Sequence, residues 1–184
     1  MPYNPAKHTG RLKRLPDSYY LGRAYVHWTL NTNDRRTGWL NDNRHQWIRE
    51  SLLHACVRHR LCCPAYCLMP DHMHFLLLGA DSKSDQRKGI AMFKSSWSEG
   101  MPAYPLQRQA FDHVIRGSER ERDALLKVVY YILDNPVRKE LVRNFSNWTY
   151  SGSLVPGYPR LNPRKFHFWQ NFWNAYADLA GAQW

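Results

Sequence analysis

Two histidines separated by one residue, in the run His72-Met73-His74, are the first side chains whose spacing suggests chemistry. On a β-strand, residues i and i+2 share a face, and their Cα atoms lie roughly 6–7 Å apart. Two imidazoles at that spacing can bind one divalent ion, while Met73 and Phe75 point to the opposite face. The alternative is a pair of surface histidines on a hairpin, which needs no ion. A metal site also requires further ligands from elsewhere in the chain.

Segment 130–136, with the sequence YYILDNP, offers a nucleophile next to an oxygen ligand. Residues four apart on a helix are neighbours, so Tyr131 lies beside Asn135, and Tyr130 lies beside Asp134. A carboxylate is the harder ligand for magnesium or manganese, which favours Tyr130 with Asp134. The helical wheel favours Tyr131 with Asn135, because this pair borders the apolar stripe while the other pair faces solvent.

Both residues of the favoured pair also have an ordinary structural interpretation. Asn135 followed by Pro136 fits the N-cap and first turn of a short helix. Tyr131 fits a half-buried aromatic side chain of an amphipathic helix. The residue types alone therefore leave both interpretations open.

A sheet has to position the two histidines. Apolar patterning and turn residues predict four strands, at residues 24–30, 65–69, 72–78 and 111–115. In the first strand, Tyr25, His27 and Thr29 share one side. Only Pro70 and Asp71 separate the second strand from the third, which is typical of a β-hairpin.

Helices must pack on that sheet. Apolar residues at helical spacing predict helices over residues 43–60 and 86–98, and a third helix from Ser118 to a break near Pro136. Ser118 and Glu121 fit a capping box at the start of the third helix. The order strand, helix, strand, strand, helix, strand, helix predicts an α+β fold, in which an antiparallel sheet carries the helices.

Both ends of the chain differ from its centre. Residues 1–20 are rich in proline and basic side chains and predict a cationic N-terminal arm. Residues 154–184 form an aromatic C-terminal tail with one helix, and residues 21–153 form the domain between them. The stripe from Phe168 to Tyr176 is typical of a helix that docks on a domain, although stacking on single-stranded bases is the alternative.

Four cysteines, Cys56, Cys62, Cys63 and Cys67, lie close together in the sequence. Adjacent Cys62 and Cys63 point to opposite faces of a strand, and the Cys-x2-Cys spacing of zinc sites is missing. We expect small buried side chains here rather than a structural zinc ion.

Charge identifies a class of partner. The 184 residues include 26 Lys and Arg against 15 Asp and Glu, a formal net charge of +11. Such an excess favours a polyanion, and nucleic acid in particular. Aliphatic runs are too short to span a bilayer, and no apolar segment follows Met1. We expect a cytoplasmic protein without a membrane partner.

Three motifs together resemble a known family. Segment 69–78, MPDHMHFLLL, resembles the HUH motif (His, hydrophobic, His) of the single-tyrosine transposases. Segment 131–138, YILDNPVR, resembles the Tyr-x-x-x-Asn-Pro-Val motif of their REP-associated branch. Segment 111–116, FDHVIR, is similar to the strand that precedes this helix in the branch. The resemblance keeps the same order from about Tyr25 to Ser153.

The resemblance implies a ferredoxin-like antiparallel sheet with helices packed on it, the HUH nuclease architecture. His72 and His74 would bind a divalent metal ion, Mg²⁺ or Mn²⁺, and Asn135 would complete its protein ligands. Tyr131 would be the nucleophile, and Tyr130 has no counterpart role.

The implied function is a metal-dependent transposase that cleaves and rejoins single-stranded DNA through a covalent 5′-phosphotyrosine intermediate. Its substrate would carry a hairpin of the repetitive extragenic palindrome type, bound by a monomer or homodimer associated with the bacterial nucleoid. A non-catalytic hairpin-binding protein of the same fold is the alternative. Candidate DNA contacts are the residues Lys94, Arg108, His113, Arg116 and Arg138.

Overall fold

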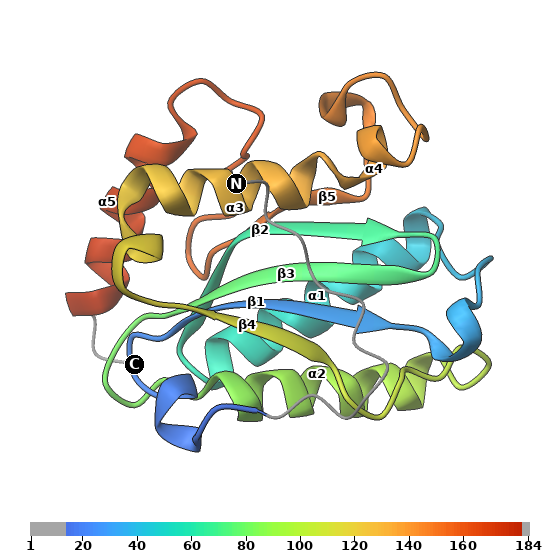
Figure 1. The fold of residues 1–184 in the computed structure, drawn as a ribbon, viewed down its shortest axis with the longest axis horizontal. Coiled ribbons are helices and arrows are strands. Elements are labelled where there is room, and N and C mark those ends of the chain that lie inside the picture. The colour runs from blue at the N-terminus through green and yellow to red at the C-terminus, as the bar shows by residue number, and fades with distance from the viewer. Residues whose placement is uncertain (1–13, 182–184) are drawn as a thin grey trace.

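Five strands form one antiparallel sheet in the computed structural model, which describes residues 14–181. The strands are β1 (Tyr25–Asn31), β2 (Leu61–Met69), β3 (His72–Gly79), β4 (Phe111–Ile115) and β5 (Ser151–Leu154). Their order across the sheet is β4-β1-β3-β2-β5, as Figure 1 shows. The first four strands have the order and connections of a ferredoxin-like fold, and β5 extends the sheet beside β2. The predicted α+β class is confirmed.

Helices α1 (Asp42–Arg58) and α2 (Gln86–Gly100) cover one face of this sheet. Each helix begins at a side chain that accepts a hydrogen bond from the first turn: Asn41 from the Arg44 N–H and Asp85 from the Lys88 N–H. Their apolar sides pack on alternate residues of β1 and β3, among which Trp28 and Phe75 are fully buried.

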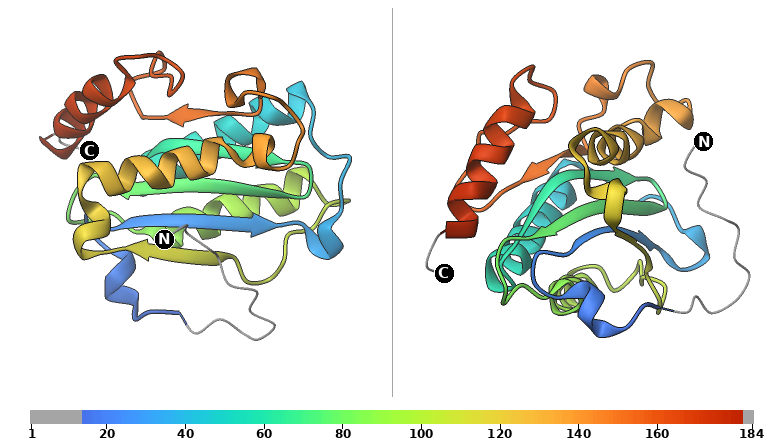
Figure 2. Two further views of the ribbon diagram at one scale, coloured as in Figure 1. Left: turned by 45° about the horizontal axis from the view of Figure 1, so that its top comes forward. Right: turned by 60° about the vertical axis from the view of Figure 1, so that its left-hand side comes forward.

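The opposite face carries α3 (Arg122–Leu133) and α5 (Phe168–Gly181), with the short helix α4 (Asn135–Arg138) directly after α3 (Figure 2). The aromatic stripe of the tail docks on the sheet as the spacing predicts, because Phe168, Phe172 and Tyr176 are buried in this second core.

Strands β2 and β3 are buried along their whole length. Since helices cover both faces, these strands lack the alternation of polar and apolar residues that marks a strand with one wet face. The predicted hairpin around Pro70 and Asp71 is confirmed, but β2 begins four residues before the predicted start. Its pairing with β3 shifts register between Cys62 and Ala65, on either side of the proline at position 64.

The start of α3 differs from the predicted capping box. Residues Gly117–Arg120 form a 3₁₀ turn, and α3 begins only at Arg122. Glu119, rather than Glu121, reaches back, and its Oε2 accepts a hydrogen bond from the Arg116 N–H at 3.2 Å. Gly117 has φ +53°, a left-handed conformation that turns the chain out of β4 before a helix can start.

Three further 3₁₀ turns connect these elements, at Asp17–Tyr20, Asn33–Arg35 and Phe145–Asn147. Most of the predicted N-terminal arm, including Lys7, Arg11 and Lys13, lies outside the described residues. Within residues 14–181, no helix is long and apolar enough to cross a membrane.

Candidate functional site

Strand β3 brings both motif histidines to the face covered by α3. In the antiparallel pairing of β3 with β1, His72 lies opposite Asn31, and His74 lies opposite Thr29. Met73 and Phe75 point into the other core, as the strand period predicts. Both histidines are buried, which excludes the alternative of an exposed pair on a hairpin.

The imidazole rings of His72 and His74 approach each other through their Nε2 atoms. His72 Nε2 lies 3.1 Å from His74 Nε2, and the rings meet edge to face. The other nitrogen of the first ring, His72 Nδ1, lies 2.6 Å from Asp71 Oδ1. This carboxylate keeps the proton on Nδ1 and leaves the lone pair of Nε2 directed toward His74.

A third histidine extends the chain of rings. His27 Nε2 and Thr29 Oγ1 each lie 3.1 Å from His74 Nδ1. His27 is almost completely buried, and this burial, with a smaller effect of the charge on His113, lowers its pKa to about 3. The ring of His27 is therefore neutral near pH 7.

Sequence reasoning placed His27 on a strand but gave it no role. Alternation correctly puts it on the same side as Thr29. No sequence signal shows that this side meets His74, because the contact depends on the pairing of β1 with β3, whose residues are distant in the sequence.

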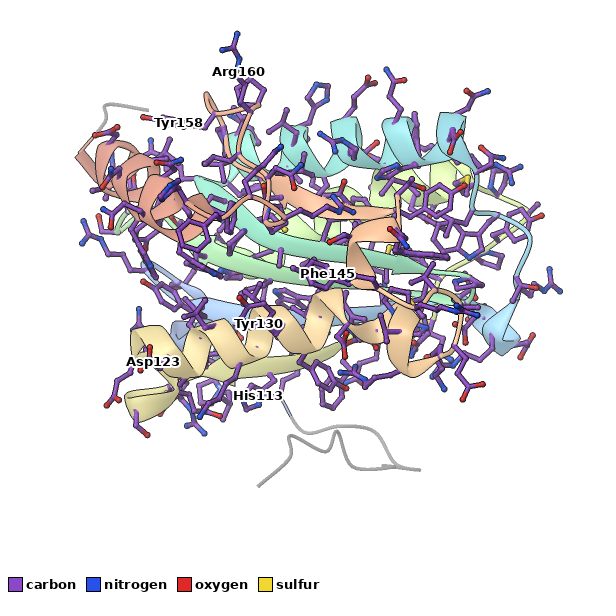
Figure 3. All side chains as sticks on the ribbon, turned by 90° about the horizontal axis from the view of Figure 1, so that it is seen from above. His113, Asp123, Tyr130, Phe145, Tyr158 and Arg160 are labelled. Carbon is purple, nitrogen blue, oxygen red and sulfur yellow. The ribbon has the colours of Figure 1, made fainter. Side chains whose placement is uncertain are left out.

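Tyr131 lies on the side of α3 that faces the histidines. Its ring centroid is 6.1 Å from that of His27 and 6.3 Å from that of His74, in both cases edge to face. Tyr130, which Figure 3 labels on the same helix, is 54% exposed. The helical wheel therefore separated the two tyrosines correctly, although a role in catalysis is a further question.

Asn135 is buried where α3 ends. Its Nδ2 donates to the carbonyl oxygens of Tyr131 at 3.0 Å and Ile132 at 3.2 Å, in the last turn of α3. Its side chain also acts to raise the pKa of His74, although burial has the larger effect and lowers it. The short helix α4 does carry Pro136 in its first turn, but Asp134 occupies the N-cap position expected for Asn135.

Arg138 contacts both Tyr131, the candidate nucleophile, and Asn135. Its guanidinium carbon lies 3.9 Å from the centroid of the Tyr131 ring, within the range of a cation–π interaction. Its Nη2 donates to Asn135 Oδ1 at 2.9 Å. Arg138, predicted as a DNA contact, is thus also part of the framework around Tyr131.

The donor atoms fit a divalent ion. Two nitrogens that bind one ion at about 2.1 Å and at right angles lie about 3 Å apart, close to the separation of the two Nε2 atoms. Burial is the largest effect on both histidines and lowers their pKa values, which favours the neutral form that binds metals. The described residues contain no group of three His, Cys, Asp or Glu side chains that could hold a metal ion. A third protein ligand from the motif would be the amide oxygen of Asn135, which here accepts a hydrogen bond from Arg138.

The remaining predicted DNA contacts lie in different places: His113 pairs with His27 between β4 and β1, on the sheet face that carries α3, whereas Lys94 belongs to α2 on the opposite face. Lys94 Nζ donates to the carbonyl oxygens of Gln107 and Arg108, and Lys94 and Arg108 line an open cavity of about 670 Å³ beside α2. His113 Nε2 lies 3.0 Å from Glu119 Oε1, and Arg116 packs over the ring of Tyr19.

The four cysteines are buried, as expected for small core side chains. Cys62 and Cys63 lie in different cores, on opposite faces of the sheet. Burial raises the thiol pKa of Cys56 and of Cys67 to about 12, so these thiols are protonated near pH 7.

Comparison with known proteins supports the resemblance seen in the motifs. No protein-family model matches the chain. A curated relative from Haemophilus influenzae, named "Putative REP-associated tyrosine transposase", is 24% identical over 138 residues, which cover 67% of this chain and 76% of the relative. The solved structure of a REP-associated tyrosine transposase bound to a REP hairpin has a TM-score of 0.63 and 23% identity, and covers 78% of this chain and 82% of that one. The structural likeness confirms the fold, and the curated relative confirms the family resemblance.

Proposed function

We propose that this chain is a REP-associated tyrosine transposase that cleaves and rejoins single-stranded DNA through Tyr131. The observation that carries the proposal is the convergence of Tyr131 on the His72 and His74 pair, from elements nearly sixty residues apart in the sequence. A half-buried tyrosine with no role beyond packing would not need two imidazole nitrogens directed at one point beside it.

The chemistry assigned to Tyr131 is a transesterification. Its hydroxyl oxygen attacks the scissile phosphorus in line, and a phosphotyrosine bond forms as the bond from phosphorus to the 3′ oxygen breaks. The proton lost by the tyrosine is balanced by the proton gained by the leaving 3′ hydroxyl. Because one ester replaces another, the reverse attack by a 3′ hydroxyl rejoins the strand without an external energy source.

His72, His74 and Asn135 are the residues proposed to hold Mg²⁺ or Mn²⁺. When bound, such an ion supplies positive charge that stabilises the phosphate in the transition state. Asp71, His27 and Thr29 hold the two imidazole rings in the orientation that this requires.

Hairpin DNA is the proposed substrate. The solved relative is bound to a REP hairpin, and the formal net charge of +11 suits a polyanion. The half-buried Lys94 of α2 and the exposed Arg108 and Arg116, which flank β4, would contact phosphates and not bases.

A covalent adduct tests the proposal. Full-length protein is incubated with labelled single-stranded hairpin DNA and Mg²⁺ or Mn²⁺, and the mixture is then separated under denaturing conditions. We expect a protein–DNA adduct that Tyr131→Phe abolishes, because phenylalanine lacks the attacking oxygen. Tyr130→Phe is the matched control and should leave the adduct intact.

Two outcomes would contradict this assignment. Loss of the adduct in Tyr130→Phe alone would identify the neighbouring tyrosine as the nucleophile. Tight hairpin binding by the wild type, with no adduct at any metal concentration, would favour the non-catalytic hairpin-binding protein.

A further inference from the structure

The loop between β5 and α5 combines positive charge with an exposed aromatic ring. Residues 159–167, here called the 159–167 loop, include the cations Arg160, Arg164 and Lys165. Phe166, next to them, is 95% exposed, far more than the other large apolar side chains on the described surface. Figure 3 shows Arg160 projecting away from the body of the molecule. A ring so exposed adds nothing to the core, so its position has to be explained differently.

A small polar cavity of about 140 Å³ lies at the base of this loop. Its lining includes Arg49 of α1, residues 151–153 of β5, Arg160 and Arg164, and contains no carboxylate. Among the described residues, these three arginines and Lys165 form no ion pair. Their charge is therefore available to an anion.

Arg164 is held rigidly in this cavity wall. Its Nη2 donates to the carbonyl oxygen of Trp148 and to both the carbonyl and hydroxyl oxygens of Ser151. Its Nε is buried and has no hydrogen-bond partner among the described residues. Arg49 is held by the hydrogen bond from its Nη1 to the hydroxyl of Tyr66 at 2.9 Å. Two fixed guanidinium groups thus face a space large enough for a phosphate.

We propose that the 159–167 loop is a binding site for single-stranded DNA, in which the arginines bind the backbone and Phe166 stacks on a base. Positively charged grooves beside exposed aromatic rings are the common design of single-strand binding sites, since every base has a face on which an aromatic ring can stack. The inference rests on the proposed function only for the choice of DNA as the polyanion.

The position of the loop relative to Tyr131 suits this role. Helix α5, which follows the loop, covers the same face of the sheet as α3 (Figure 2). The loop itself lies at the β5 edge of the sheet, where its cavity also borders Arg49 of α1 on the opposite face. A strand bound at Tyr131 would reach the loop by passing over this edge. The loop would then hold single-stranded DNA that extends beyond the cleavage site.

Fluorescence anisotropy with a labelled oligothymidylate of about ten nucleotides measures this interaction in the full chain at several salt concentrations. We expect Phe166→Ala to weaken binding about tenfold at every salt concentration, because stacking is not ionic. Phe166→Tyr should restore binding. Arg160→Ala should instead flatten the dependence of log Kd on log salt by about 0.7, the value for one phosphate contact on a single strand.

Matched controls come from the exposed side of α1. Val57→Ala removes an exposed apolar side chain and Arg58→Ala an exposed cation, and both should bind as the wild type does. The inference is wrong if Phe166→Ala binds as tightly as Val57→Ala, or if Arg160→Ala keeps the salt dependence of Arg58→Ala.

Binding and cleavage have separate readouts. An adduct at Tyr131 together with normal binding by Phe166→Ala would overturn the loop site and leave the proposed function intact. Binding that depends on Phe166, without any adduct, would support the loop site and contradict the proposed cleavage activity.

Discussion

Four side chains, Asp71, His72, His74 and His27, form a continuous polar chain that runs from the turn between β2 and β3 across the sheet face covered by α3. Burying polar groups is costly unless each has a hydrogen-bond partner. Here the three contacts between neighbouring side chains, from Asp71 to His72, from His72 to His74 and from His74 to His27, are all within hydrogen-bond distance. The chain therefore fixes the direction of both His72 and His74 before any ligand arrives, which is the preorganisation that a metal site requires.

His27→Phe tests this positioning role. Phenylalanine fills a similar space but removes the Nε2 partner of His74 Nδ1, leaving only Thr29 Oγ1. We expect the affinity for Mn²⁺ to fall about tenfold, the lower end of the effect of such supporting residues on metal sites. Electron paramagnetic resonance of free Mn²⁺ measures it without any need for DNA.

His54→Phe is the matched control, since His54 lies exposed on α1. An unchanged Mn²⁺ affinity in His27→Phe would mean that Thr29 Oγ1 alone orients His74. A loss in both variants would point to a general effect on folding.

At the scale of secondary-structure elements, the junction of α3 and α4 brings together the residues of the Tyr-x-x-x-Asn motif. A break is required here because proline at position 136 cannot continue the hydrogen-bond ladder of α3. Asn135 donates to two carbonyl oxygens in the last turn of α3, and its own oxygen accepts a hydrogen bond from Arg138. The same side chain thus caps one helix and carries the oxygen that we propose as a metal ligand.

Asn135→Asp separates these two roles. Aspartate keeps an oxygen acceptor but loses the Nδ2 donor. Its negative charge also lies beside the carbonyl end of α3, where the helix dipole disfavours it. We expect the free energy of unfolding to fall by about 1 kcal/mol. Urea denaturation with a chelator present measures the structural effect alone.

Asn144→Asp provides a matched change at another turn. Asn144 only accepts a hydrogen bond, from the Ser146 N–H, and aspartate accepts it equally well. Equal stability of the two variants would show that the Nδ2 bonds of Asn135 contribute nothing measurable.

For the molecule as a whole, α5 decides how much of the chain folds as one unit. Its buried stripe closes one end of the second core, where the hydroxyl of Tyr176 donates to the carbonyl oxygen of Gly79 at the end of β3. Phe172 is fully buried there and stacks on both Phe168 and Tyr176. The aromatic tail is therefore part of the folded core on the sheet face that also carries α3.

Phe172→Ala should lower the free energy of unfolding by about 3–5 kcal/mol, the usual cost of removing a buried aromatic ring. Phe166→Ala is the internal control, because an exposed ring contributes little to stability. Thermal or urea unfolding measures both variants. A small loss in Phe172→Ala would mean that α5 is only loosely attached to the sheet.

Much of the fold could be predicted from local patterns in the sequence. The hairpin around Pro70 and Asp71, the strand at 111–115 and the stripe of α5 all have patterns set by neighbouring residues. Strand β5 was not predicted, since its four residues Ser151–Leu154 have little β-forming character and become a strand only by pairing with β2. The late start of α3 was also missed, because Ser118 lies in a 3₁₀ turn that the left-handed Gly117 begins.

The sequence alone determined which residues are candidates for chemistry, because the His-x-His spacing and the helical period each place side chains on one face of their own element. It could not determine what those faces meet. Only the tertiary structure brought Tyr131 to His74, added His27 behind it, and left Phe166 exposed while it buried Phe172. These outcomes depend on strand pairing and on helices docking across long stretches of chain, and no local pattern of residues encodes such contacts.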